Sequence, residues 1–97
     1  MAREALEWMS RFDEHLRLER RVSPHTVAGY RRDVRALAAF CAAQGVCDWA
    51  GLDARHVRAF LAARHRAGLR GRSLQRTLSA VRTFYSYLLR EGAAVRN

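Results

Sequence analysis

The chain has 97 residues, of which 49% are hydrophobic, which is enough for one domain with a modest core. It carries 18 basic and nine acidic residues, a net charge of +9, so we expect a polyanion partner, with nucleic acid ahead of an acidic membrane surface. The apolar runs are too short to cross a bilayer and the first residues do not form a secretory signal, so we expect a cytoplasmic protein whose two cysteines stay unpaired.

The positive charge is concentrated in the second half of the chain. Residues 53–97 hold ten arginines against two acids, whereas residues 1–52 hold eight arginines against seven acids. The absence of lysine is typical of a GC-rich genome, and a solvated arginine-rich surface is the alternative interpretation. The codon bias of such a genome does not explain the shortage of acidic residues. We therefore expect a basic surface built mainly by the second half of the chain.

A first amphipathic helix is expected over residues 3–20. Its apolar stripe consists of Ala5, Trp8, Met9, Phe12 and Leu16. Leu6 and Leu18 fall off this stripe, so they either cover a neighbouring element or face a partner.

The second helix has a clear start. Ser23 is a good N-cap and Pro24 suits the first helical position, and the helix then runs to about Gln44 before Gly45 ends it. Its core stripe consists of Val27, Tyr30, Val34, Leu37, Ala38 and Cys41. His25 and Thr26 project from the first turn, where the helix N-terminus favours a phosphate.

Residues 45–53 form a connection in which Trp49 and Leu52 are expected to seal the core. Asp53 then caps a third helix that runs to about residue 67. Its inward residues are Val57, Phe60 and Leu61. In the following link, Gly68 and Gly71 would allow a close approach to another backbone or to a phosphate.

The fourth helix is predicted from an N-cap at Ser73 to a left-handed stop at Gly92. Its apolar stripe consists of Leu74, Leu78, Val81, Phe84, Tyr85, Leu88 and Leu89, with Tyr87 off the stripe. The opposite face consists of Gln75, Arg76, Ser79, Arg82, Thr83, Ser86 and Arg90. A solvated helix usually mixes charge signs. This face contains no acid, so we expect it to lie against something negative.

The four helices with short links predict an all-α bundle. The sequence contains no catalytic motif and no metal-ligand spacing among its histidines and cysteines, so we expect no cofactor and no metal. The candidate DNA contacts come from the second helix and from the start of the fourth. They are Ser23, His25, Thr26, Arg31, Arg32, Arg70, Arg72, Ser73, Gln75, Arg76, Ser79, Arg82 and Thr83.

These side chains suit two kinds of DNA contact. Arginines on phosphates give affinity and position, whereas Gln75, Arg76 or Arg82 would reach base edges if the fourth helix enters a major groove. A short helix–turn–helix within residues 53–85 is the alternative arrangement.

Two blocks of sequence resemble a known family. The pattern S-x-x-T-x-x-x-Y-x-x-D begins at Ser23 and ends at Asp33, and the pattern S-x-x-R-x-L-S-A-x-R-x-F-Y-x-Y-L begins at Ser73 and ends at Leu88. Together they resemble the N-terminal core-binding (SAM-like) domain of tyrosine recombinases of the Xer type, over nearly the whole chain. The SPHT start and the G-L-x-x-x-S-L link are more similar to the XerC branch than to the XerD branch, although the two branches share most of this pattern.

The resemblance implies an orthogonal four-helix domain that forms one half of a clamp around double-stranded DNA. The second and fourth helices would lie near the major groove, and the first helix, with Leu6 and Leu18, would contact a neighbouring protomer. Cutting and rejoining DNA would belong to a C-terminal catalytic domain that follows residues 1–97, and no tyrosine here matches the catalytic one. The family's XerC and XerD proteins act together to resolve chromosome dimers before cell division.

Two alternatives stay open at this stage. One is a XerD-like protein or another integrase paralogue of the same family. The other is a helical protein-interaction module whose basic face meets an acidic protein.

Overall fold

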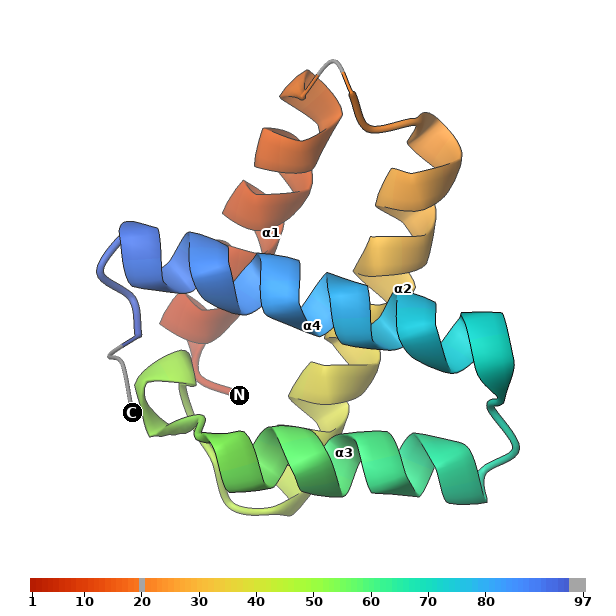
Figure 1. Ribbon diagram of the computed structural model, residues 1–97. Helices are drawn as coiled ribbons and strands as arrows, with labels where there is room; N and C mark the ends of the chain where they lie inside the picture. Colours follow the sequence, from red (N-terminus) through yellow and green to blue (C-terminus); the bar gives the residue numbers. More distant parts are fainter. Residues whose placement is uncertain (20, 95–97) are drawn as a thin grey trace.

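A computed structural model describes residues 1–19 and 21–94 of the chain. Within these ranges the elements are α1 (Arg3–Leu18), α2 (Pro24–Ala43), the short 3-10 helix η1 (Trp49–Gly51), α3 (Ala54–Arg66) and α4 (Gly71–Arg90). Figure 1 shows α1 and α2 as one pair and α3 and α4 as a second, with α4 crossing over the first pair. The all-α, orthogonal four-helix prediction is therefore confirmed. None of the helices in the described ranges is both long enough and apolar enough to span a bilayer.

Most of the predicted helix ends are confirmed because local side chains fix them. The Ser23 hydroxyl accepts a hydrogen bond from the Thr26 amide at 3.1 Å, and Asp53 and His56 form a capping box at the start of α3. Gly45 and Gly92 follow α2 and α4 with positive φ angles of 82° and 79°. The first helix ends at Leu18 with Glu19 as its C-cap, and the predicted end at residue 20 lies outside the described residues.

The predicted start of the fourth helix is wrong by three residues. The N-cap is Arg70, which makes no side-chain capping bond, and the helix begins at Gly71. Gly71 has a φ of +51°, a conformation that glycine adopts without the steric cost of a Cβ, so the chain turns into the helix there. Ser73 lies inside the first turn, where its amide donates to the Arg70 carbonyl at 3.1 Å.

All four helices and η1 contribute to the core, and an aromatic cluster lies where α1, α4 and η1 meet. The Phe84 ring is fully buried, with its centroid 4.8 Å from the Trp49 ring and 5.0 Å from the Phe12 ring. The Trp49 indole donates to the Ala5 carbonyl at 2.9 Å, which ties η1 to α1. Trp49 and Leu52 seal this core as predicted.

The buried side of α4 differs from the predicted stripe. Its buried residues are Thr77, Ala80, Val81, Phe84, Tyr87 and Leu88. The half-buried residues are Leu74, Leu78, Tyr85 and Leu89. The difference arises because α4 packs against α1 and α2 on one side and against α3 on the other, so its most buried arc lies between them. Tyr87, predicted to lie off the stripe, packs on α1 with its ring 5.5 Å from that of Phe12.

Gly68 and Gly71, in the link before α4, were predicted to allow a close approach to another backbone, and the structure shows no such approach within the protein. A Cβ at Gly68 or Gly71 would meet nothing within 4 Å, and both residues have positive φ angles instead. At Gly29 in α2 a Cβ would lie 3.5 Å from Arg76 Cδ, which is an ordinary van der Waals contact, so Gly29 lies directly beside the Arg76 side chain of α4.

The two cysteines have different environments. Both are free thiols, and Cys41 is buried whereas Cys47 is exposed. Burial raises the pKa of the Cys41 thiol to about 11. Cys41 is therefore a small buried hydrophobe, as its place on the apolar stripe predicted.

Candidate nucleic-acid interface

A buried carboxylate marks the crossing of α2 and α4. Asp33 of α2 is 2% exposed and accepts two hydrogen bonds from the Arg76 guanidinium, at 3.0 Å from Nε and 3.2 Å from Nη2. The Thr77 hydroxyl lies 3.1 Å from Asp33 and 3.0 Å from the Ser73 carbonyl, so its single proton serves one acceptor at a time. The hydrogen bond to Asp33 is the main reason why the pKa of Arg76 is raised.

Arg76 therefore stabilises the packing of α4 on α2 and also forms part of the exposed surface. Its stem packs on Gly29, while 40% of its side chain stays exposed. Asp33 and Arg76 come from the two separate sequence blocks that carry the family resemblance, and they are 43 residues apart. Their pairing fixes how α4 sits on α2, and so it fixes the relative position of the two helices predicted to contact DNA.

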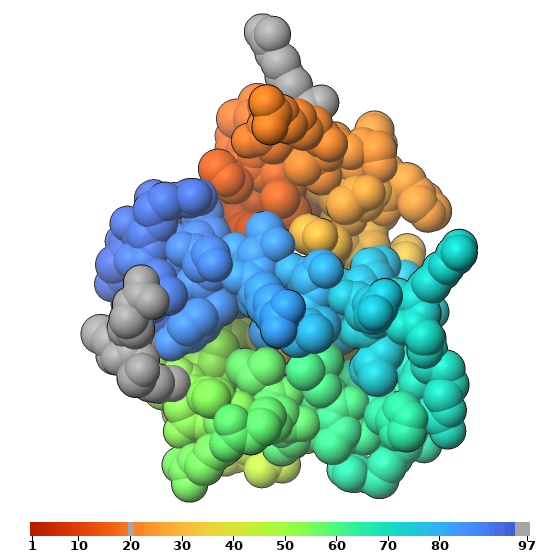
Figure 2. Space-filling view, viewed as in Figure 1, coloured from red at the N-terminus to blue at the C-terminus, as the bar shows by residue number. Residues whose placement is uncertain are grey.

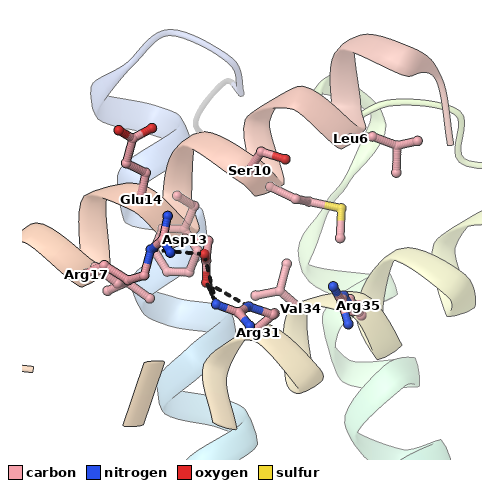
Figure 3. A pocket seen from close by; sticks show the side chains of 11 residues that line it. Leu6, Ser10, Asp13, Glu14, Arg17, Arg31, Val34 and Arg35 are labelled. Atoms are coloured by element: carbon pink, nitrogen blue, oxygen red, sulfur yellow. Dashed lines mark hydrogen bonds and ion pairs between the residues drawn. The ribbon is translucent and has the colours of Figure 1, made fainter. Parts of the chain in front are cut away.

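Arg31 points away from this crossing. Its guanidinium donates to both carboxylate oxygens of Asp13 in α1, at 2.9 Å and 3.0 Å (Figure 3). This pair raises the pKa of Arg31. It lines a groove of about 470 Å³ between α1 and α2 that also includes Arg17 and Leu6. The structure thus separates Arg31 from the other predicted DNA contacts and gives it a partner within the protein.

The remaining arginines of the predicted face are solvent-exposed. Figure 2 views the face across which α4 runs, with α1 and α2 above it and α3 below. The exposed predicted contacts of α4 are Arg72, Ser73, Gln75, Ser79, Arg82 and Thr83. His25 and Arg32 of α2 are exposed as well. Within the described ranges, Arg32, Arg72 and Arg82 make no hydrogen bond or ion pair with another side chain, so their charges remain available to a ligand.

Three other predicted contacts are partly engaged within the protein. The Ser23 and Thr26 hydroxyls lie 3.0 Å apart and complete the α2 cap. Arg70 donates to the His65 carbonyl at 2.7 Å, which closes the link between α3 and α4. All three side chains remain at least partly accessible, at the ends of the two helices.

Asp33 and Thr77 are the site residues that the sequence reasoning missed. One signal was available, because Asp33 is the single acid in a helix segment that contains Arg31, Arg32 and Arg35. Such an isolated acid among arginines indicates a specific partner. In the part of the chain that the structure describes, no group of three or more His, Cys, Asp or Glu residues is placed to hold a metal ion.

Comparisons with known proteins identify the family to which this domain belongs. The family model described as phage integrase, N-terminal SAM-like domain, matches residues 9–92. Tyrosine recombinase XerC of Pseudomonas syringae pv. syringae (strain B728a) is 54% identical over 78 residues, which cover 80% of this chain and 26% of that protein. Tyrosine recombinase XerC of Azotobacter vinelandii is 52% identical over 81 residues, covering 84% of this chain and 27% of that protein.

The chain thus spans about a quarter of the length of the curated relatives it matches. No solved structure gives a significant match. The family match covers all of α2, α3 and α4, and it includes both residues of the Asp33–Arg76 pair. The chain therefore belongs to the phage integrase family, as an N-terminal SAM-like domain similar to that of XerC tyrosine recombinases.

Proposed function

We propose that this chain is the DNA-binding clamp domain of a XerC-like site-specific tyrosine recombinase. The observation that carries the proposal is the exposed face of α4, where Arg72 and Arg82 have no partner among the described residues, next to Arg32 of α2. Arginines presented in this way neutralise phosphates. The side chains between them, Gln75 and Ser79, are of types that read base edges in a major groove.

The activity of the parent enzyme is part of this proposal. The relatives are named tyrosine recombinases, and we infer that the parent protein cuts and rejoins DNA with residues outside these 97. In this proposal it works in the cytoplasm with a XerD-like partner and resolves chromosome dimers before segregation. This domain contributes binding and positioning, and no catalytic residue is assigned within it.

The expected result for the unmodified chain is salt-sensitive binding to a duplex recombination half-site. Fluorescence anisotropy across a salt series should give a linear fall of log K with log salt, with a slope of about −0.9 for each phosphate neutralised. A slope near zero would contradict the electrostatic basis of the proposal.

The same assay separates DNA binding from a role as a protein-interaction module. A labelled acidic peptide serves as the probe for that alternative. Two competition experiments are compared: unlabelled duplex against labelled peptide, and unlabelled peptide against labelled duplex. If the basic face is a DNA site, the duplex should displace the peptide at a lower concentration than the peptide needs to displace the duplex. The reverse order would favour the protein-interaction module.

A further inference from the structure

The exposed face of α4 continues beyond Thr83 into a pocket shared with α1. Ser86 and Arg90 lie one and two turns after Arg82, so the three side chains follow one line along the helix. With Thr83 of α4 and His15 of α1 they line a pocket of about 350 Å³. This pocket is continuous with the candidate interface, because Arg82 and Thr83 belong to both.

The basic groups of this pocket are held in place by contacts within the protein. The His15 ring lies on Tyr87, with the ring centroids 5.0 Å apart, and the Arg90 guanidinium lies over the same ring at 5.9 Å. Arg90 Nη2 is 3.5 Å from His15 Nε2. Both residues are exposed and line the pocket, so Tyr87 holds two nitrogen-bearing side chains beside the same open space.

The Arg90–His15 contact depends on the protonation state of the imidazole. A guanidinium nitrogen can only donate, so the contact is favourable only when His15 Nε2 carries no proton. Protonation places two cations side by side, which is unfavourable unless an anion lies between them. The other charged or titratable groups that line this pocket are Glu19, directly after α1, and Arg82 and Tyr87 of α4. Arg11 and Glu14 of α1 and Glu91, directly after α4, interact electrostatically with Tyr87, on which the His15 ring lies.

We propose that this pocket is a backbone phosphate site that extends the DNA interface from α4 onto α1. Arg82 and Arg90 neutralise the phosphate, the Ser86 and Thr83 hydroxyls donate to it, and His15 joins as a donor when it is protonated. The proposal rests on the DNA-binding function proposed above. It predicts that DNA binding takes up a proton at His15, so that affinity rises as the pH falls.

The test measures binding of the chain to duplex DNA at pH 8.0 and pH 5.5 at constant ionic strength. We expect affinity to rise by about three- to tenfold at the lower pH, because the phosphate gains one charge-assisted hydrogen bond. The slope of log K against log salt should steepen by about 0.9, equivalent to one more phosphate contact. The His15→Gln variant should lose both changes.

His65→Gln is the matched control, because His65 is also exposed but lies in the last turn of α3, outside the predicted contacts. This variant should keep the pH effect, and circular dichroism should show that both variants are folded. Equal pH dependence in the wild type and His15→Gln, or its loss in His65→Gln instead, would overturn the phosphate pocket while leaving the DNA-binding proposal intact. Absence of DNA binding by the wild type at either pH would instead contradict the proposed function.

Discussion

Replacing Arg76 with alanine should destabilise the fold by about 2–4 kcal/mol, although 40% of the side chain is exposed. The reason lies in its partner, because Asp33 is 2% exposed and would lose two of its three hydrogen bonds, which leaves only the one from Thr77. A buried carboxylate without a counter-ion is costly, and the Thr77 hydroxyl alone cannot neutralise it. Urea unfolding followed by circular dichroism measures the change in the free energy of unfolding.

Arg72→Ala is the control for this experiment, since Arg72 is exposed on the same helix and should change stability by no more than about 0.5 kcal/mol. A double-mutant cycle with Asp33→Ala should show a coupling energy of at least about 1 kcal/mol. Wild-type stability in Arg76→Ala would mean that the pair does not hold the two helices together. A loss of DNA binding in Arg76→Ala is consequently no proof of a DNA contact.

Phe84→Ala should be still more destabilising, by about 3–5 kcal/mol. The Phe84 ring is fully buried and lies between the rings of Trp49 and Phe12, so its removal leaves a cavity where α1, α4 and η1 meet. A small domain has only about 5–15 kcal/mol of total stability, so this variant loses a large fraction of it.

Thr83→Ala is the neighbouring control, because Thr83 is exposed and its removal should leave the unfolding midpoint nearly unchanged. Thermal unfolding followed by tryptophan fluorescence, which reports on Trp49 as well as Trp8, compares the two variants. Similar unfolding midpoints for Phe84→Ala and the wild type would contradict the position of the core.

The helices could be predicted because their signals are local. Ser23 with Pro24, Asp53, Gly45 and Gly92 each mark a helix end through contacts or φ angles within a few residues. The start of α4 was misplaced because Ser73 has the right chemistry for a cap, whereas Gly71 turns the chain two residues earlier.

The buried arc of α4 depends on partners that sequence periodicity does not reveal. An apolar stripe shows that a helix buries one side, but not that two layers pack on it from different directions. Tyr87 is buried because α1 lies beside it. Leu78 is only half-buried because it lines a second groove, which lies between α3 and α4. Both misassignments have this one cause.

The candidate site could be predicted only in part, again because the sequence does not reveal which helices pack against each other. Charge and helical spacing identified the exposed arginines of α4, including Arg82. The Asp33–Arg76 and Asp13–Arg31 pairs join residues 43 and 18 positions apart, and they exist only once the helices cross. The sequence alone does not distinguish an arginine that is paired within the fold from an arginine whose charge is free to bind a ligand.

The exposed face of α4 is the surface that we propose binds DNA. The most direct measurement compares Arg82→Ala with Arg35→Ala, because both arginines are exposed and both substitutions remove one positive charge. Arg35 lines the groove between α1 and α2, with Arg31, and so lies away from the α4 face. Any difference between the two variants is therefore an effect of position.

We expect Arg82→Ala to weaken binding to a duplex half-site by about tenfold and to reduce the steepness of the salt dependence by about one phosphate contact. Arg35→Ala should change affinity by less than about twofold, since Arg35 lines the groove between α1 and α2 and acts on DNA at the α4 face only through screened charge. Both variants should unfold at the wild-type urea concentration. Equal losses of affinity in the two variants would contradict the account, because they would show that net charge, and not the α4 face, governs binding.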